Sequence, residues 1–126
     1  MRRKEKVHGL IIDESAKAYP ISSFDREIET INDILNLTPV VVAGSSQKHF
    51  AVSFIRTVED GTVLEFSPVQ GLLPIVMQDN EGTTWDVFGN GVEGPRKGSR
   101  LRQVESFDAY WFAWGTFYPD IDIYKK

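Results

Sequence analysis

Cysteine is the residue whose absence from this sequence excludes most. The chain has 126 residues and no cysteine, which excludes disulfides, thiolate metal sites, iron–sulfur clusters and cysteine nucleophiles, but leaves the compartment open. Histidine is scarce, with only His8 and His49 present. The patterns H-x-x-x-H, H-E-x-x-H and G-x-S-x-G do not occur, so no local motif supports a zinc hydrolase or a serine esterase. A triad of His49 with an Asp and a Ser assembled only in space stays open, because triads are defined by geometry.

Long apolar runs and a strong positive charge are also missing. No stretch approaches the roughly 18 apolar residues of a membrane span, so we expect none in this chain. The net charge of −4 disfavours nucleic acid as a partner held across the whole surface. We expect residues 1–6 to be a solvated basic tail, because the apolar run after them is too short for a signal segment. Residues 7–126 are expected to form one β-rich domain.

Turn-forming residues recur about every 8–12 residues, a spacing typical of chains that fold mainly as strands. A helical turn is expected over Ser22–Arg26, and Glu27–Ile31 fits both a helix and a strand because its isoleucines have helical spacing but β-branched side chains. The valine-rich run after Pro39 suits only a buried strand. The predicted strands are Lys6–Ile12, Ala16–Ile21, Pro39–Ala43, Ile75–Gln78, Thr83–Phe88 and Ser99–Val104.

The clearest hairpin is predicted in HFAVSFIRTVEDGTVLEFS, residues 49–67. Phe50, Val52 and Phe54 alternate onto one face of the outgoing strand. Asp60-Gly61 supplies the residue pair that a tight turn with positive φ requires. A return strand is expected over Val63–Phe66.

Near the C-terminus the apolar period changes. In SFDAYWFAWGTFYP the aromatic residues recur at i, i+3, i+4 and i+7, Ser106 can cap a helix and Pro119 can end it. The spacing predicts a short aromatic helix. The expected fold is therefore mainly β (β-rich α+β): an antiparallel sheet curled into a barrel or sandwich, with a short C-terminal aromatic helix.

Gly89, Gly91 and Gly94 fit the pattern G-x-G-x-x-G. A dinucleotide site needs a helix directly after these glycines, and a Walker loop needs Lys-Ser/Thr. Pro95-Arg96 follows instead, so we interpret the glycines as turns between strands. No cofactor is predicted.

A basic patch follows the glycines. Its positive charge suits an anion, an acidic partner or a local nucleic-acid contact, or else forms a solvated cluster that protects a sheet edge. The patch consists of Arg96, Lys97, Arg100 and Arg102.

Acidic side chains form a second group of candidates. Asp79, Glu81 and Asp86 offer the hard oxygen ligands that Ca²⁺ prefers, with His49 as a further ligand, although EF-hand spacing is absent. Two of these acids could alternatively act as an acid–base pair. The simpler interpretation is a polar hairpin loop.

Aromatic side chains form the third group. Exposed Trp and Tyr would provide a stacking surface for sugars, peptides or bases, whereas helical spacing favours core packing. The ligand-binding candidates are Trp85, Asp86, Tyr110, Trp111, Trp114 and Arg56.

From Asp79 onward the sequence resembles a known family. DNEGTTWDVFGNGVEGPRKGSRL and FDAYWFAWGTFYPDIDIY are similar to the closing half of the domain of unknown function 3179 family, and residues 17–21, 31–33, 39–42 and 54–56 agree with earlier parts of its pattern. Much of that family has a Cys-Pro-x-Cys-like pair after the valine-rich strand, where residues 43–49 here contain no cysteine. A metal or redox role for that pair therefore does not transfer to this chain. The resemblance implies a prokaryotic, often exported or lipid-anchored protein, but no mechanism.

Two functions are open at this point. The leading hypothesis is a non-enzymatic module of an exported prokaryotic protein that binds an unidentified small molecule or protein. The alternative is a small metal-assisted or carboxylate-based hydrolase built on Asp79, Asp86 and His49, with Arg56 or Arg96 stabilising an oxyanion.

Overall fold

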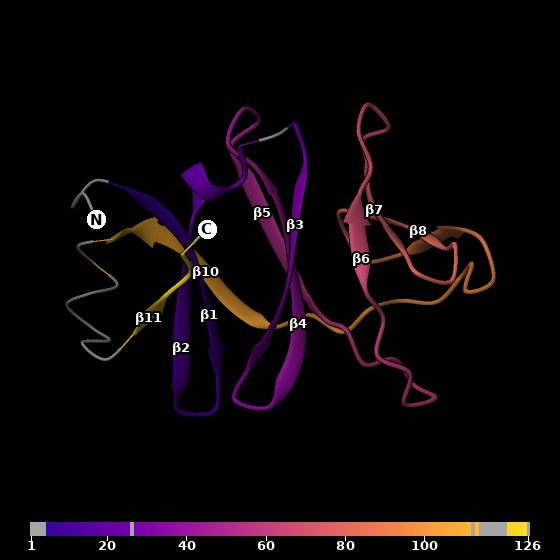
Figure 1. Ribbon diagram of the computed structural model, residues 1–126, viewed down its shortest axis with the longest axis horizontal. Coiled ribbons are helices and arrows are strands. Elements are labelled where there is room, and N and C mark those ends of the chain that lie inside the picture. Colours follow the sequence, from indigo (N-terminus) through magenta and orange to yellow (C-terminus); the bar gives the residue numbers. More distant parts are fainter. Residues whose placement is uncertain (1–4, 26, 112, 114–120, 126) are drawn as a thin grey trace.

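Strands dominate the computed structural model, which describes residues 5–25, 27–111, 113 and 121–125 (Figure 1). The protein is mainly β, as predicted. Among these residues, no helix has the length and apolar character needed to span a bilayer. The elements are β1 (Lys6–Ile12), β2 (Ser15–Pro20), the 3-10 turn η1 (Ile21–Ser23), β3 (Glu29–Leu35), β4 (Thr38–Ser45), β5 (Phe50–Ile55), β6 (Phe66–Pro68), β7 (Ile75–Asp79), β8 (Thr84–Asp86), β9 (Gly91–Glu93), β10 (Glu105–Tyr110) and β11 (Asp122–Ile123).

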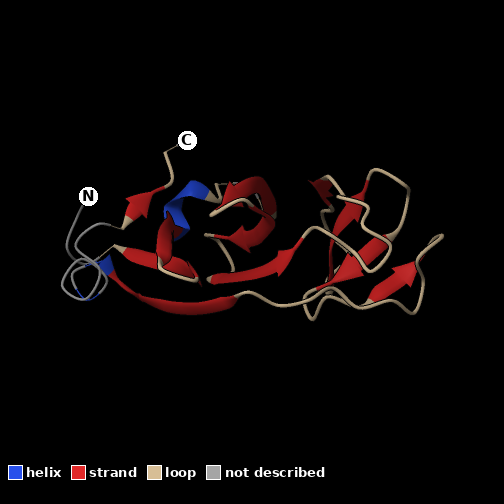
Figure 2. Ribbon diagram, turned by 90° about the horizontal axis from the view of Figure 1, so that it is seen from below, coloured by secondary structure: helices blue, strands red, loops and turns tan. Residues whose placement is uncertain are grey.

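These strands form three sheets, with the orders β10-β1-β2-β11, β3-β4-β5 and β6-β7-β8-β9. Pairing is antiparallel except between β11 and β2, which are parallel. The sheets follow one another along the long axis of the molecule, and both views show this order (Figures 1 and 2). The described strands do not close into a barrel, so the single curled sheet expected from the sequence is replaced by three separate sheets.

The valine-rich strand β4 explains this arrangement. Residues 40–43 are all fully buried, as the sequence predicts for a strand of this composition. Alternate side chains of a strand point to opposite faces. On one face they belong to a core cluster with Tyr19 of β2, and on the other to a cluster with Trp85 of β8. The second sheet is therefore an inner layer with apolar side chains packed against both of its faces.

Two side-chain carboxamides link the second and third sheets. Phe66 N donates to Asn32 Oδ1 (2.9 Å), and Asn32 Nδ2 donates to Phe66 O (2.8 Å). Likewise, Ile28 N donates to Gln70 Oε1 and Gln70 Nε2 donates to Ile28 O, both at 2.7 Å. Each carboxamide makes the pair of bonds that a facing strand would make, and so satisfies backbone groups that β3 and β6 would otherwise leave open.

An ionic cluster links the first and second sheets. Asp33 Oδ2 on β3 accepts hydrogen bonds from Lys17 Nζ (2.7 Å) and from the Tyr19 hydroxyl (2.8 Å). Partial burial opposes ionisation of Asp33, but the bond from Lys17, the backbone N–H of Ile34 and the bond from Tyr19 outweigh it and lower the pKa of this carboxyl. Burial, together with the hydrogen bond to Asp33, raises the pKa of Tyr19. The cluster therefore consists of a carboxylate, an ammonium and a neutral phenol at neutral pH.

The prediction of a C-terminal helix is corrected. Its first residues form β10, which pairs with β1 from Lys6↔Tyr110 to Ile11↔Glu105. Of the remainder, Trp111 and Ala113 are described, both with helical backbone, while residues 112 and 114–120 lie outside the described residues, so no C-terminal helix is seen. Pairing with β1 satisfies backbone groups that would be exposed at an open sheet edge. The free energy gained by this pairing exceeds the helix preference that the spacing of the aromatics indicates.

The predicted turn lies where expected, but of the expected pair with positive φ only Gly61 has it, at +86°. Gly61 N donates to Val58 O, so the turn is centred on Glu59 and Asp60. The predicted return strand is wrong. After one bridge between Thr57 and Val63, the chain leaves β5 and enters the third sheet. The outer edge of β5 is covered by another segment, because Ile55 N donates to Arg102 O (2.8 Å).

The remaining elements follow the sequence in part. The ambiguous segment after Glu27 is a strand, β3, and the helical turn expected over Ser22–Arg26 is the short η1, which ends at Ser23. The strand predicted over Ser99–Val104 is wrong. This stretch makes isolated bridges, Asn90↔Arg100 and Phe54↔Gln103, because it runs as a connection from the third sheet toward the first (Figure 1).

The carboxamide link generates a first prediction. Asn32→Ala removes both bonds to Phe66, which leaves the Phe66 N–H without its acceptor and the Phe66 C=O with only the longer bond from Thr30 Oγ1 (3.3 Å). We expect the free energy of unfolding to fall by about 1–3 kcal/mol, measured by urea unfolding. Gln47→Ala, which also removes a side-chain carboxamide but at an exposed position, is the control. It should change the free energy of unfolding by less than about 0.5 kcal/mol. Equal effects of the two substitutions would contradict a bridging role for Asn32.

The ionic cluster generates a second prediction. Lys17→Met removes the ammonium but keeps most of the apolar stem, so the pKa of Asp33 should rise toward its usual range, as followed by NMR of the carboxyl carbon. A folded-state pKa below the unfolded-state value of ~4 contributes stability at higher pH, and that stability is lost as the pH falls. In the variant the pKa of Asp33 is lowered less. The variant should therefore lose less stability than wild type on acidification. Lys48→Met, at an exposed site, should leave the pKa of Asp33 unchanged. An unshifted Asp33 in Lys17→Met would contradict the assignment.

Candidate functional site

A chain of two hydrogen bonds joins Asp108, His8 and Ser53. Asp108 Oδ1 lies 2.6 Å from His8 Nδ1, and Ser53 Oγ lies 3.0 Å from His8 Nε2. Since a carboxylate can only accept, His8 Nδ1–H donates to Asp108. In the neutral imidazole this tautomer leaves Nε2 as the acceptor of the Ser53 O–H. A carboxylate, an imidazole and a hydroxyl in this order form the arrangement that activates a serine oxygen in unrelated hydrolases.

Strand pairing brings these residues together. His8 on β1 is the cross-strand partner of Asp108 on β10, so both side chains lie on the same face of the first sheet. Ser53 lies on β5 of the second sheet, and its bond to His8 therefore crosses from one sheet to the next. His8 and Ser53 are buried, at 3% and 5% exposed, whereas the Asp108 side chain is 63% exposed.

A small hollow adjoins this chain. Its volume is about 180 Å³, and all three residues of the chain border it. The other residues around it come from β5, β10, the segment before β10 and the turn after β8. The lining consists of His8, Ala51, Val52, Ser53, Phe54, Val87, Gln103, Val104, Ser106, Phe107 and Asp108.

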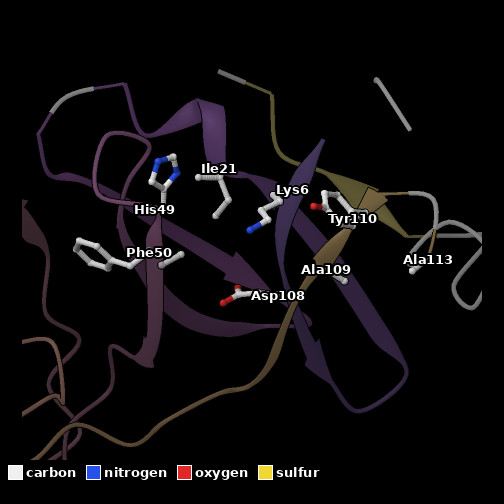
Figure 3. A pocket seen from close by; sticks show the side chains of 9 residues that line it. Lys6, Ile21, His49, Phe50, Asp108, Ala109, Tyr110 and Ala113 are labelled. Atoms are coloured by element: carbon white, nitrogen blue, oxygen red, sulfur yellow. The ribbon is translucent and has the colours of Figure 1, made fainter. Parts of the chain in front are cut away.

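A wider hollow of about 370 Å³ lies beside the small one and shares Ala51 and Asp108 with it. In Figure 3, His49, Phe50 and Ile21 lie on one side of it, and Lys6 and Tyr110 lie on the other. Apolar side chains make up most of the wall. The lining consists of Lys6, Ile21, His49, Phe50, Ala51, Asp108, Ala109, Tyr110 and Ala113.

Lys6 and Tyr110 form the polar end of the wider hollow. The Lys6 ammonium lies over the Tyr110 ring, 5.9 Å from its centroid, as cross-strand partners on β1 and β10 allow. No carboxylate of the described residues lies within ion-pair distance of this ammonium. The hollow thus combines mostly apolar walls with the Lys6 ammonium and the Asp108 carboxylate.

The aromatic candidates are separated in the structure. Trp85 is fully buried in the core, where its ring meets Phe66 edge to face. Tyr110 lines the wider hollow, and Trp111 packs partly against Val7 and Ala18. Trp114 lies outside the described residues.

The acidic candidates hold turns. Asp79 is buried, and its carboxylate accepts bonds from Trp85 Nε1 (2.9 Å) and from the backbone N–H groups of Glu81 and Thr83 (2.8 and 3.1 Å). Asp86 Oδ1 accepts the backbone N–H groups of Phe88 and Asn90, both at 2.9 Å. Within the described ranges, no three His, Asp or Glu side chains gather as metal ligands would.

Two arginine candidates make several contacts within the protein. The buried guanidinium of Arg56 donates to the carbonyl oxygens of Val40 (2.8 Å), Leu64 (3.1 Å) and Asp33 (2.8 Å), and to Glu65 Oε1 at 3.0 Å. It thereby joins strands β3 and β4 to the segment that leads into β6.

Arg96, from the basic patch, forms an exposed cluster. It donates to Glu81 Oε1 (2.7 Å) and to Asp60 Oδ2 (3.2 Å). The bond to Glu81, followed by that to Asp60, raises the pKa of Arg96, and hydrogen bonds from Thr62 and Arg96 lower the pKa of Asp60. Arg100 shares with Arg96 the lining of a polar hollow of about 530 Å³. Lys97 and Arg102 are outside that lining.

The glycine loop is a set of turns, as predicted. Gly94 has φ +112°, which side-chain-bearing residues rarely adopt. At Gly91 the reason is proximity, since a Cβ there would lie 2.5 Å from the Arg96 carbonyl oxygen. The short strand β9, which begins at Gly91, was not foreseen.

Sequence reasoning missed Ser53, His8 and Asp108 as a group. It placed a possible triad around His49, which instead lines the wider hollow from the turn before β5. The three residues are separated by 45 and 55 positions, so no short motif joins them. Only the pairing of β1 with β10 could have brought them together in a prediction. That pairing was not predicted because the segment of β10 was expected to form a helix.

The geometry defines a class: a mainly β protein in which a Ser–His–Asp chain joins two sheets beside a partly apolar hollow. The chain belongs to the family described as protein of unknown function (DUF3179), whose model matches residues 1–121. This confirms the family resemblance found in the sequence. No curated protein and no solved structure matches the chain.

The buried carboxylate of Asp79 generates a third prediction. Asp79→Ala leaves the Trp85 indole N–H and two backbone N–H groups without an acceptor, so the free energy of unfolding should fall by about 2–3 kcal/mol. Glu81→Ala, which breaks an exposed pair with Arg96, should cost less than about 1 kcal/mol. Urea unfolding followed by Trp fluorescence measures both. A smaller loss for Asp79→Ala than for Glu81→Ala would contradict this assignment.

Proposed function

We propose that the protein binds a small amphipathic carboxylate in the wider hollow between β1, β10 and β5. The observation that carries the proposal is the combination of a cavity of about 370 Å³ with the Lys6 ammonium at one end. Small-molecule sites are commonly cavities of roughly 300–1,000 Å³ with mostly apolar walls and a few polar groups that orient the ligand.

The walls indicate what the body of the ligand is. Ile21, Phe50, Ala51 and Ala109 present apolar surface to the hollow. A ring or a branched aliphatic group would replace water against these side chains, and this gains free energy in proportion to the apolar area covered. A purely polar ligand would leave the same surface wet.

The charges indicate the sign of its polar end. The Lys6 ammonium offers three donors, and its contact in the described structure is with the face of the Tyr110 ring. Asp108, the acidic residue of the lining, already accepts a bond from His8 at 2.6 Å. A carboxylate thus finds a donor in Lys6, whereas an amine finds an acceptor whose Oδ1 is already bonded to His8.

The alternative of a hydrolase built on Asp79, Asp86 and His49 has less support. Asp79 and Asp86 hold turns in the third sheet, and His49 lies at the wider hollow beside the first and second sheets. An exported setting remains an expectation of the family resemblance.

A titration with phenylacetate tests the proposal. We expect ¹⁵N-detected NMR shifts confined to residues around the hollow, with Ile21, Phe50 and Tyr110 among them. Lys6→Gln should weaken binding about tenfold, a loss of about 1.4 kcal/mol for one charge-assisted bond. Lys48→Gln, which removes a lysine one position from His49 but outside the lining, should leave the affinity unchanged.

The same titration with phenethylamine and with hexanoate tests which charge and which apolar group the hollow accepts. Hexanoate should bind at the same residues, and phenethylamine should bind more weakly than phenylacetate. Absence of shifts with both carboxylates at millimolar concentration, or equal binding of the amine, would overturn the proposal.

A further inference from the structure

We propose that Ser53 is a nucleophile for short carboxylic esters, with His8 as its general base and Asp108 as the residue that positions His8. The inference goes beyond the proposed binding function and does not depend on it. It starts from the order of atoms Asp108 Oδ1, His8 Nδ1, His8 Nε2 and Ser53 Oγ, joined at 2.6 and 3.0 Å.

Both distances lie in the range needed for proton transfer. A general base must lie within about 2.6–3.2 Å of the group whose proton it takes, and His8 Nε2 meets this condition toward Ser53. The bond to Asp108 holds the imidazole in the tautomer that leaves Nε2 free to accept. A hydroxyl bonded to a backbone carbonyl would lack this base.

The surroundings of the chain favour reaction over simple packing. Ser53 and His8 are almost dry, at 5% and 3% exposed, and electrostatic interactions are stronger where water is excluded. Ser53 nevertheless borders the small hollow of about 180 Å³, so a short acyl group has a place beside its oxygen. Asp108 is the exposed member, which weakens its hold on His8 and implies a slow enzyme.

A backbone donor for an oxyanion lies at the outer edge of β5. Arg56 N donates to Pro39 O and Ile55 N donates to Arg102 O, so alternate N–H groups along this strand point toward β4 and away from it. By this alternation the N–H of Ser53 points away from β4, toward the edge where Gln103 also borders the small hollow. The Ser53 N–H is the group we assign to the oxyanion.

The reaction balances without any further reactant except water. Ser53 Oγ attacks the ester carbonyl carbon while His8 Nε2 takes the hydroxyl proton. The bond from that carbon to the alkoxy oxygen then breaks, and His8 returns the proton to the leaving alcohol. Water, deprotonated by His8, attacks the acyl-serine, and Ser53 recovers its proton as the carboxylic acid leaves.

Covalent labelling tests the nucleophile directly. Wild-type protein is treated with a small alkyl fluorophosphonate, which loses fluoride when a serine oxygen attacks phosphorus, and is then analysed by intact and peptide mass spectrometry. We expect one adduct, on the peptide that contains Ser53. Ser53→Ala should lose the adduct, and Ser67→Ala, which removes an exposed hydroxyl on β6 outside the hollow, should keep it.

Steady-state hydrolysis of p-nitrophenyl acetate tests the other two roles. Asp108→Asn should lower kcat at least about tenfold and leave KM unchanged, because it perturbs the base and not the binding of the ester. Ser53→Ala should reduce the rate to that of the protein's nonspecific background. Melting curves confirm that each variant is folded.

The outcomes separate the two proposals. Absence of an adduct on wild-type Ser53, an adduct on another serine, or an unchanged rate in Ser53→Ala would overturn the nucleophile. Adduct mapping on wild type decides the question even if Ser53→Ala fails to fold. Phenylacetate binding without labelling would leave only the proposed function standing, and labelling without phenylacetate binding would leave only the nucleophile.

Discussion

Burial of β4 on both faces is the constraint on which the rest of the structure depends. A strand with valines at three successive positions has no polar face to offer to water, so it must lie inside. One face of the second sheet needs the first sheet as cover, and the other face needs the third. A closed barrel of the same strands would expose one face of β4, and this explains why three stacked sheets replace it.

Stacked sheets must also satisfy the polar groups at their junctions. In this protein side chains do so: Asn32 and Gln70 between the second and third sheets, and Asp33 and the His8–Ser53 pair between the first and second. Buried polar groups are costly unless every one finds a partner. The candidate site is therefore part of the junction between two sheets, and its residues are oriented by the strands that carry them.

The sequence predicts local features well and long-range pairing poorly. The alternation in β5, the valines of β4 and the position of the turn before β6 depend on neighbouring residues and are confirmed. The partner of β1 depends on residues about 100 positions away, and the aromatic spacing there favoured a helix. For the same reason the hydrogen-bonded group of His8, Ser53 and Asp108 could not be predicted from one sequence, although each residue is visible in it.

The carboxamide links have a consequence for how the molecule opens. The third sheet joins its neighbour through side chains and packed apolar groups, and it shares no strand ladder with the second sheet. The side chains that make these links are Asn32, Gln70 and Thr30, together with Arg56 at the segment that leads into β6. Because one apolar cluster packs between these two sheets, separating them would uncover one face of β4 as well as break the side-chain links, so the third sheet is held by the same burial that fixes β4.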